Sequence, residues 1–347
     1  MSSTVGRHRC ATPCLCHDVS LQGRGTPIVP AYGCQNVDVR RNGKAVETTV
    51  HDYEMSKDAR HEVRRSVRGL LAGNRAPGVG FAVFGNGGRV LFSEGYGISY
   101  GDATPGPDTV FRIASMSKSF TAATILSLVA EGQVRLDDSV ERYATSFNPV
   151  TSWGNDAMPV TVGMLMSMSS GLATDDPWAD RQESVPQEDL HRLMAQGLRY
   201  VFRPGEGFEY SNAGFAILGD VISSVTGRTV PAVVRERFLE PLGLTRTGYD
   251  YRLVGHDRAV GHSLHGGRWV EEAFTAPGSF SCIGGVLSTV EDISRWAGWL
   301  SSAFADDASA SDGPLPRRYR RVMQQGHTSI TPVVRSGGAR GRLHVPE

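Results

Sequence analysis

Lysine is scarce in this sequence of 347 residues. Of its 36 lysine and arginine residues, only Lys44, Lys57 and Lys118 are lysines. Long apolar runs are missing as well, since no stretch approaches the roughly 18 residues of a membrane-spanning helix. The formal net charge is zero, so neither sign of charge is in excess. Electrostatic attraction to nucleic acid or to an anionic membrane surface is therefore not expected. The sequence predicts a globular protein without a membrane span or a nucleic-acid partner.

Cysteine is also sparse, with five residues, an odd number. Four stand near the start of the chain and Cys282 stands far from them, which is not the pattern of a disulfide framework. A candidate metal-binding group near the start comprises Cys10, Cys14, Cys16, His17 and Cys34. This group lacks the paired C-x-x-C spacing of zinc sites, so we expect no metal there. The first fifty residues also lack the apolar h-region of a secretory signal, which favours a cytoplasmic location.

The composition divides the chain into three parts. Residues 1–54 are polar and aperiodic, which predicts a disordered leader, and a start at Met55 would omit it altogether. Residues 55–303 alternate helical and strand-like patterns, which predicts a mixed α/β domain. Residues 304–347 form a tail with one more helix, over 316–325. The arginines expected on a solvated face of that helix are Arg317, Arg318, Arg320 and Arg321.

Local patterns place the main elements. The apolar spacing over 61–73 predicts a helix ended by Gly73, and Asn86–Gly87–Gly88 predicts the turn of a β-hairpin within 77–97. A helix is expected from Ser115 to Gly132. The remaining predicted elements are a short helix capped by Thr161 and ended by Gly171, helices over 187–196, 213–226 and 230–239, a strand over 279–288, and a helix over 290–302 capped by Thr289 with Asp292 completing a capping box.

Ser115 and Lys118 stand three positions apart on one helical face, so the hydroxyl and the amine can reach each other. A serine hydroxyl is a weak nucleophile and needs a neighbouring base. A lysine amine serves as a base when burial and the positive end of a helix dipole destabilise its ammonium form. Arginine cannot replace it, because its guanidinium does not deprotonate in proteins. The pair predicts a nucleophile with its base, and a surface lysine at chance spacing is the alternative.

Tyr210 and Asn212 precede another predicted helix. A tyrosine beside a lysine–serine pair can relay a proton to a leaving group, and an asparagine amide can hold both the lysine and a substrate carbonyl. The alternative for Tyr210 is a buried tyrosine with a purely structural hydrogen bond. The backbone N–H of Ser115, at a helix start, points to where an acyl oxyanion would form.

Together and in this order, the two motifs resemble those of the serine β-lactamase and penicillin-binding-protein superfamily, more closely its class C branch with the related esterases and D-peptidases. The resemblance runs over roughly 62–302. The matching stretches are PGVGFAVF, GYG, DTVFRIASMSKSFTA, LMSMSSGL, FEYSNAGFAILG, EPLGL and GGVLSTVEDISRWAGWL.

The resemblance implies an antiparallel sheet flanked by helices beside an all-helical domain, with the site at their junction. By motif, it implies that Ser115 is the nucleophile, Lys118 the base and Tyr210 the proton relay. Asn212 would be the substrate-positioning amide, with Ser170 and Gly171 of SSGL as structural neighbours. The implied reaction is acyl transfer to water through a covalent acyl-enzyme, which needs protein groups and water but no cofactor. The expected substrates are small esters, D-amino-acid peptides or β-lactams, esters and peptides being favoured.

The family's third motif, Lys or His followed by a small residue and Gly, has no convincing counterpart. His265–Gly266–Gly267 precedes GGVLS in a predicted polar hairpin turn, and His327 is followed by Thr and Ser, without the required glycine. We therefore expect the chain to stop before the strand that carries this motif, with an incomplete sheet and half of the oxyanion hole missing. A catalytically impaired remnant or a ligand-binding pseudoenzyme is the alternative to an active hydrolase.

Overall fold

The computed structural model describes residues 55–73, 76–148, 158–174, 182–254, 257–305, 312–328 and 330, all within one unit of the chain, residues 54–347. The predicted leader and its cysteine cluster lie outside the described residues. The helices are α1 (Lys57–Ala72), α2 (Ser117–Ala130), α3 (Val162–Met166), α4 (Gln187–Ala195), α5 (Asn212–Thr226), α6 (Val230–Val234), α7 (Tyr251–Val254), α8 (Ser281–Gly284), α9 (Val290–Ser301) and α10 (Arg317–Val322). The strands are β1 (Gly78–Phe84), β2 (Val90–Gly97), β3 (Phe111–Arg112), β4 (His262–His265), β5 (Arg268–Glu271) and β6 (Leu287–Ser288).

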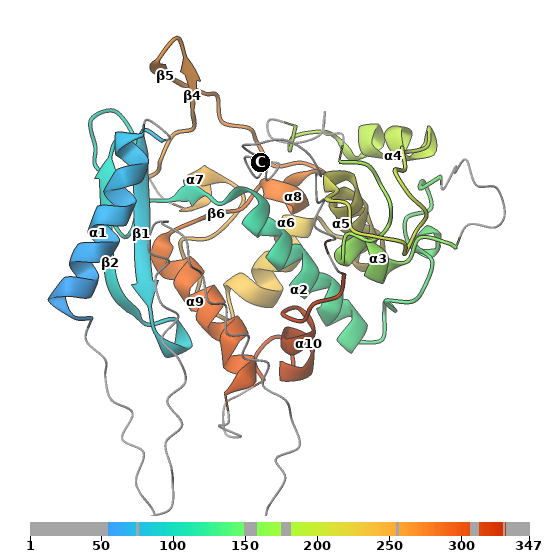
Figure 1. The fold of residues 1–347 in the computed structure, drawn as a ribbon. Coiled ribbons are helices and arrows are strands. Elements are labelled where there is room, and N and C mark those ends of the chain that lie inside the picture. The colour runs from blue at the N-terminus through green and yellow to red at the C-terminus, as the bar shows by residue number, and fades with distance from the viewer. Residues whose placement is uncertain are drawn as a thin grey trace, which may run out of the picture. The chain divides into compact units, whose positions relative to one another are not determined.

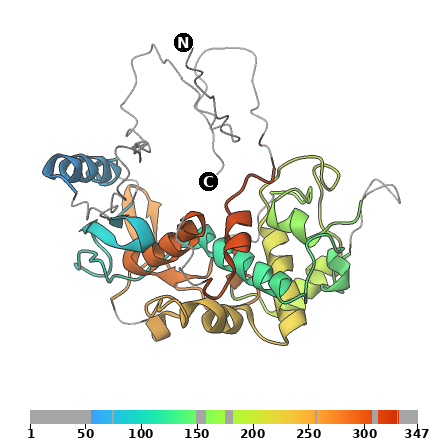
Figure 2. The same cartoon turned by 90° about the horizontal axis from the view of Figure 1, so that it is seen from below.

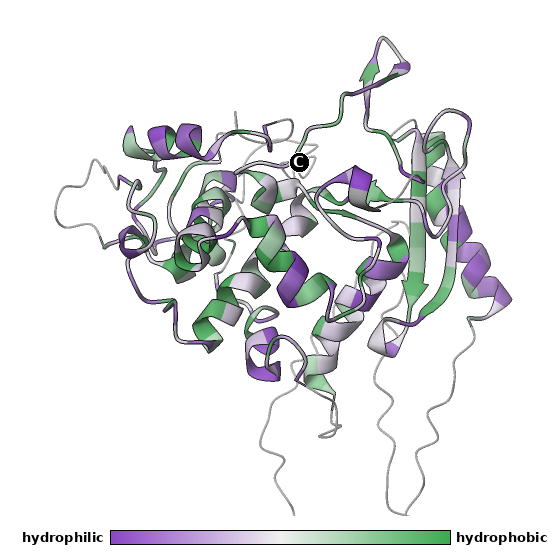
Figure 3. Ribbon diagram, turned by 180° about the vertical axis from the view of Figure 1, so that it is seen from behind, coloured by the Kyte–Doolittle hydropathy of each residue, from purple (hydrophilic) through white to green (hydrophobic). Residues whose placement is uncertain are grey.

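The helix α1 begins earlier than its apolar spacing predicts. Ser56 caps it by accepting a hydrogen bond from the Ala59 backbone N–H at 3.2 Å, and Gly73 ends it as expected. The Arg64 guanidinium pairs with the Glu94 carboxylate of β2 at 2.6 Å. In Figure 3 this helix carries mostly hydrophilic colours, as suits an element at the surface. Its predicted existence and end are therefore confirmed.

The predicted β-hairpin is present. Strands β1 and β2 pair antiparallel, and the turn over Asn86–Gly88 places Gly87 and Gly88 at positive φ, 69° and 80°. Helix α9 packs against this turn so closely that a Cβ on Gly298 would lie 2.0 Å from the Gly88 backbone nitrogen. A side chain at Gly298 would therefore separate the helix from the hairpin.

Helix α2 runs through the middle of the described structure, with α9 and the hairpin on one side and α3 and α5 on the other (Figures 1 and 2). It also packs against α6, α8 and α10. Ten of its fourteen residues are buried, from Ser117 to Leu128, so it lacks a solvated face. This burial explains why Lys118, in its first turn, lies inside the protein.

Helix α3 confirms one predicted cap and corrects one predicted end. Thr161 accepts a hydrogen bond from the Met164 N–H at 3.1 Å, as expected. The helix ends at Met166 rather than at Gly171, because Met168 already adopts a left-handed conformation with φ of 56°. The chain therefore leaves the helix before the SSGL stretch, and Gly171 lies in the connection that follows.

The predicted strand over 279–288 is wrong for most of its length. Residues Ser281–Gly284 form the short helix α8, and only Leu287 and Ser288 form a strand, β6, which pairs with β3. The Gly278 N–H donates a hydrogen bond to the Ser281 hydroxyl at 2.8 Å, in the turn just before the helix. A β-rich composition is overridden here by contacts with α2 and α5.

Helix α9 forms as predicted, and Thr289 caps it through the Asp292 N–H at 3.1 Å. The Asp292 side chain does not complete a capping box. It accepts hydrogen bonds from the Arg246 N–H at 2.8 Å and the Thr247 hydroxyl at 2.9 Å. Asp292 therefore anchors a distant loop to the helix start.

Helix α10 also forms as predicted, but one of its arginines is not solvated. Arg320 is 1 % exposed and donates hydrogen bonds to the Leu315 carbonyl at 3.1 Å and the Ser302 hydroxyl at 2.8 Å. Its burial lowers the pKa of the guanidinium. The expectation of a fully solvated arginine face is therefore wrong for Arg320, which packs α10 onto the core together with the buried Leu315.

The described strands form three two-stranded sheets, β1–β2, β3–β6 and β4–β5, within a mixed α/β arrangement. No single described helix is long and apolar enough to cross a membrane. By length and composition alone, α5 and the segment Val230–Leu239 meet that requirement only as a pair bent by 73°.

Candidate active site

Ser115 lies in a 3-10 turn, Ala114–Met116, between strand β3 and helix α2. Ala114 holds φ at 46°, a left-handed conformation that is uncommon for a residue with a side chain. The turn leaves Ser115 and Met116 exposed, while Ser117 and Lys118, at the start of α2, are buried. The serine therefore stands at the surface end of a helix whose body is in the core.

Lys118 reaches back to Ser115 from one turn along. Its Nζ lies 3.1 Å from Ser115 Oγ and 2.9 Å from the Ile283 carbonyl oxygen, and the residue is 7 % exposed. It also lies over the rings of Tyr210 and Phe215, at 5.0 and 5.7 Å from their centroids. Among the described residues, no carboxylate forms an ion pair with Lys118. The amine thus meets a hydroxyl, a carbonyl and two aromatic faces.

Tyr210 completes the cluster from a different part of the chain. Its hydroxyl lies 2.7 Å from Ser115 Oγ, and either oxygen can be the donor. The backbone around it is held by the SSGL region, because the Thr174 hydroxyl donates to the Tyr210 carbonyl at 2.6 Å and the Glu209 N–H donates to the Met168 carbonyl at 2.9 Å. Ser115 Oγ is therefore within hydrogen-bonding distance of two proton-carrying groups.

Asn212 is the first residue of α5 and is partly buried. It follows Ser211, which caps the helix by accepting a hydrogen bond from the Gly214 N–H at 3.1 Å. The structure thus brings Ser115, Lys118 and Tyr210 into contact, and Asn212 follows Tyr210 by two positions in the chain.

Ser170 and Gly171, predicted as neighbours of the site, lie in the connection after α3. Ser170 is 1 % exposed and its hydroxyl accepts from the Leu172 N–H at 3.4 Å. Gly171 has φ of 78°, and a Cβ there would lie 2.1 Å from the Phe202 carbonyl oxygen. Glycine is required at this position for both reasons.

The backbone of α8 and the residues after it supply contacts to the site that sequence reasoning missed. Besides the Ile283 carbonyl, the Cys282 carbonyl accepts from the Thr121 hydroxyl at 2.8 Å, and the Val286 N–H donates to the Ser117 hydroxyl at 3.0 Å. These bonds align the segment along the first turns of α2. The GGVLS motif identifies this part of the chain in the sequence. The short helix α8 just before it has no recognisable sequence pattern.

An ion pair between a partly buried arginine and a buried glutamate, next to the Ser115 turn, was also missed. The Arg112 guanidinium of β3 pairs with the Glu183 carboxylate, whose side chain is 2 % exposed, and Arg112 Nε donates to the Gly284 carbonyl at 3.4 Å. A Cβ on Gly284 would lie 3.6 Å from Glu183 Oε1 and 3.8 Å from the Ala114 carbonyl carbon. The pair therefore packs, through Gly284, against the turn that carries Ser115.

Among the described residues, neither candidate for the third motif forms a hydrogen bond with Ser115, Lys118 or Tyr210. His265 ends β4 and is exposed, and Gly266 and Gly267 form the tight turn of the β4–β5 hairpin at φ of 55° and 80°. That hairpin projects away from the helices in Figure 1, as the predicted polar turn requires. His327 is exposed, and its Nε2 lies 2.6 Å from the Val322 carbonyl at the end of α10.

Cys282 is a buried thiol between α8 and α5. Its Sγ lies 3.3 Å from the Phe215 carbonyl, and burial raises its pKa to about 12, against a smaller lowering effect of the Lys118 charge. The thiol is therefore protonated at neutral pH and is no candidate nucleophile.

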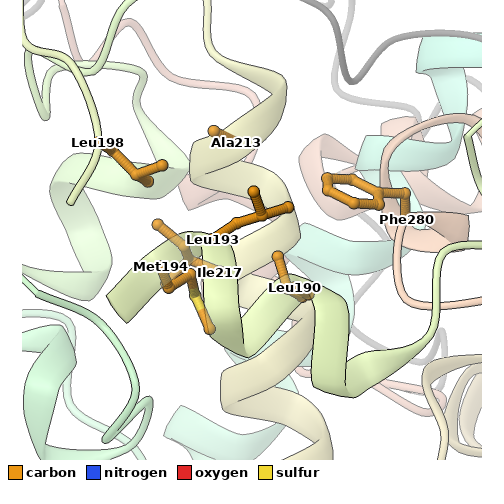
Figure 4. A pocket seen from close by; sticks show the side chains of 7 residues that line it. All are labelled: Leu190, Leu193, Met194, Leu198, Ala213, Ile217 and Phe280. Atoms are coloured by element: carbon orange, nitrogen blue, oxygen red, sulfur yellow. The ribbon is translucent and has the colours of Figure 1, made fainter. Parts of the chain in front are cut away.

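An apolar hollow next to α5 is too small for a substrate group. It has a volume of about 10 Å³, close to the minimum for one water molecule. Figure 4 shows its lining side chains, which are Leu190, Leu193, Met194, Leu198, Ala213, Ile217 and Phe280. It is a packing defect between α4 and α5. The described residues also include no group of three or more His, Cys, Asp or Glu placed to hold a metal ion.

The sequence is similar to those of known proteins. The family model described as Beta-lactamase matches residues 63–340. Protein flp of Staphylococcus aureus (strain NCTC 8325 / PS 47) is 25 % identical over 296 residues, which cover 81 % of this chain and 54 % of flp. The D-alanyl-D-alanine-carboxypeptidase/endopeptidase AmpH of Escherichia coli (strain K12) is 27 % identical over 257 residues, covering 73 % of this chain and 65 % of AmpH.

A solved structure supports the same fold. The octameric penicillin-binding protein homologue from Pyrococcus abyssi superposes with a TM-score of 0.62 at 27 % identity, covering 75 % of this chain and 59 % of that one. The chain spans about half the length of flp and slightly less than two thirds of AmpH.

Proposed function

The chain belongs to the beta-lactamase family, and we propose that it is a serine hydrolase that acts through a covalent acyl-enzyme. In this proposal Ser115 is the nucleophile, Lys118 the general base and Tyr210 the proton relay. Asn212 orients the substrate. The main observation behind this proposal is that Ser115 Oγ lies 3.1 Å from Lys118 Nζ and 2.7 Å from the Tyr210 hydroxyl.

The surroundings of Lys118 support its role as base. A buried amine without a carboxylate partner loses less on deprotonation than one held in an ion pair. As a neutral amine it can donate one hydrogen to the Ile283 carbonyl and still accept the Ser115 proton. With one hydrogen on the Ile283 carbonyl, Nζ lies 3.1 Å from Ser115 Oγ, within reach of its proton.

Acylation follows from this geometry. The Ser115 proton passes to Lys118 Nζ while Oγ bonds to the substrate's carbonyl carbon, and the carbonyl oxygen becomes an oxyanion. The Ser115 backbone N–H, in the first turn ahead of α2, is placed to donate to that oxyanion. When the tetrahedral intermediate collapses, the bond to the leaving group breaks. The leaving group takes the proton from Tyr210, which is reprotonated from Lys118.

Deacylation reverses the roles. Water gives a proton to the Tyr210–Lys118 pair as its oxygen attacks the acyl carbon. Collapse then breaks the bond to Ser115 Oγ, which regains its proton, and releases a carboxylic acid. Every proton is accounted for by the three side chains and water.

The proposed substrates are small esters or amides, with D-amino-acid peptides included. AmpH, a relative by sequence, is named for action on D-alanyl-D-alanine. Hydrolysis of an aryl ester, a D-alanyl-D-alanine peptide and a chromogenic cephalosporin should be compared for the wild type and Ser115→Ala. The proposal requires turnover of the ester or the peptide that disappears in the variant. Turnover of the cephalosporin alone would overturn the substrate class, and equal turnover by the variant would overturn the mechanism.

A second candidate is a protein that binds acyl-D-amino-acid ligands without turning them over. It is favoured because, in the described part of the chain, neither His265, in an exposed hairpin, nor His327, which contacts the Val322 carbonyl, forms a hydrogen bond with Ser115, Lys118 or Tyr210. Saturable binding of an acetylated D-alanyl-D-alanine peptide with no release of D-alanine would support this candidate. Release of D-alanine that depends on Ser115 would exclude it.

A further inference from the structure

A larger cavity lies away from Ser115, Lys118 and Tyr210, none of which lines it. Its volume of about 480 Å³ falls within the range of small-molecule sites. Its walls come from the start of α4, the middle of α5, the start of α6 and residues 277–279. Unlike the hollow in Figure 4, this cavity has room for a ligand.

Asp220 is the one charged side chain among the described residues that line this cavity. It is 4 % exposed. Its Oδ1 lies 2.7 Å from His191 Nε2 and accepts a hydrogen bond from Gln187 Nε2 at 3.0 Å. An ionised carboxylate only accepts hydrogen bonds, so His191 also donates to it. In the described part of the chain both partners use Oδ1, which leaves Oδ2 as an acceptor for a ligand.

The rest of the lining is neutral. Hydroxyl groups of Ser223, Thr229 and Ser279 supply further polar contacts, while Leu190 and Val230 belong to the apolar part. No arginine or lysine lines the described wall to balance Asp220. A buried carboxylate favours a cation that can donate hydrogen bonds, and a single carboxylate is too few ligands for a Ca²⁺ or Mg²⁺ ion.

We propose that this cavity, the Asp220 pocket, binds a small organic ammonium ion with an apolar body. The ammonium group donates to Asp220 Oδ2, and the apolar part lies against Leu190 and Val230. Anionic ligands are disfavoured by the same carboxylate. The inference does not depend on the proposed hydrolase function, because it uses none of the residues assigned to it.

The test measures binding of 2-phenylethylammonium by ligand-observed NMR at about pH 8, above the usual range of histidine titration. Phenylacetate and 2-phenylethanol serve as anionic and neutral probes of similar size. Asp220→Asn removes the charge and keeps an oxygen for His191 and Gln187. Asp189→Asn, on α4 but outside the pocket lining, is the matched control for loss of one carboxylate.

The proposal predicts saturable binding of the ammonium probe, weakened roughly tenfold or more by Asp220→Asn and unchanged by Asp189→Asn. Binding should persist in Ser115→Ala. Equal binding to Asp220→Asn, equal binding of the neutral probe, or no saturable binding in the millimolar range would overturn the proposal.

A second variant covers the case in which Asp220→Asn fails to fold. Ser223→Leu adds bulk from a half-buried position in the pocket lining and leaves Asp220 in place. It should weaken binding of the ammonium probe. Binding unchanged in a folded Ser223→Leu protein would place the probe elsewhere and contradict the assignment.

Discussion

The hydroxyl of Tyr210 lies 2.7 Å from Ser115 Oγ, although 95 positions separate the two residues in the chain. The fold makes this contact by placing the starts of α2 and α5 side by side, and the two helices pack against each other. Lys118 then joins the pair from the first turn of α2. The reactive hydroxyl thus belongs to a three-residue cluster rather than to an isolated serine.

Replacing Lys118 by arginine tests the base directly. The guanidinium of the variant would keep the positive charge but cannot accept a proton, so ester hydrolysis should fall by about 10²–10⁴-fold. The measurement is kcat on the aryl ester, with thermal unfolding of both proteins as the check on folding. Lys57→Arg, at an exposed position of α1, should retain full activity. A Lys118→Arg protein that keeps wild-type turnover would show that the serine is activated in another way.

Replacing Tyr210 by phenylalanine removes one oxygen and keeps the ring over Lys118. The proton relay is then lost, and kcat should fall by about 10²-fold or more. Tyr100→Phe, at a residue that is 57 % exposed, is the matched control and should leave kcat unchanged. If Tyr210→Phe changes the melting temperature but not kcat, the Tyr210 hydroxyl has only a structural role.

The Arg112–Glu183 pair should stabilise both the fold and the Ser115 turn. Glu183→Gln leaves the partly buried guanidinium without its counter-charge, which should cost roughly 1–3 kcal/mol of unfolding free energy. Glu291→Gln, in an exposed pair with Arg295, should cost about 0–1 kcal/mol. Urea unfolding measures both values.

A second measurement tests whether Glu183 also positions Ser115. The rate at which a fluorophosphonate labels Ser115 should fall in Glu183→Gln under conditions where the protein stays folded, and recover partly in Glu183→Asp. A loss of stability with an unchanged labelling rate would mean that the pair stabilises the fold without positioning Ser115.

The buried Cys282 thiol should make stability fall in alkali. Its pKa is raised by burial from 9.0 to about 12 in the folded protein, so between these pH values the unfolded chain loses a proton that the folded chain keeps. The contribution to stability is complete below pH 9 and is lost as pH rises toward 12. The unfolding free energy should therefore decline more steeply than in Cys282→Ala, by up to about 1.4 kcal/mol per pH unit. Parallel pH curves for the two proteins would contradict the assignment.

Several elements were predictable because their signals are local. Thr161 and Thr289 each cap a helix through an N–H three residues ahead, so their effect can be recognised in a few letters of sequence. The Ser115–Lys118 contact has the same origin, since residues three apart share a helical face.

Most of the predictions that were wrong concern residues whose structure depends on partners elsewhere in the chain. Arg320 is buried because Ser302 and the Leu315 carbonyl accept its hydrogen bonds, and Asp292 turns to Thr247 instead of its own helix. Residues 281–284 form a helix where a strand was expected, packed against α2. No local pattern encodes these partners.

The residues of the site also divide into those that the sequence could predict and those that it could not. Motif order pointed to Tyr210, and the structure places its hydroxyl against Ser115. The pairing of Arg112 with Glu183 could not be found, because an ion pair between remote residues leaves no spacing to recognise. The Ile283 carbonyl was missed for a related reason, since every residue has a carbonyl and only the fold selects one.

The central claim is that Lys118 and Tyr210 activate Ser115. The most direct test is the intact mass of the full chain after exposure to a fluorophosphonate, beside Ser115→Ala. The account predicts a single phosphonyl adduct on the wild type, formed as Ser115 Oγ bonds to phosphorus and fluoride leaves, and none on the variant. A folded wild-type protein without an adduct, or an adduct that persists in Ser115→Ala, would contradict it.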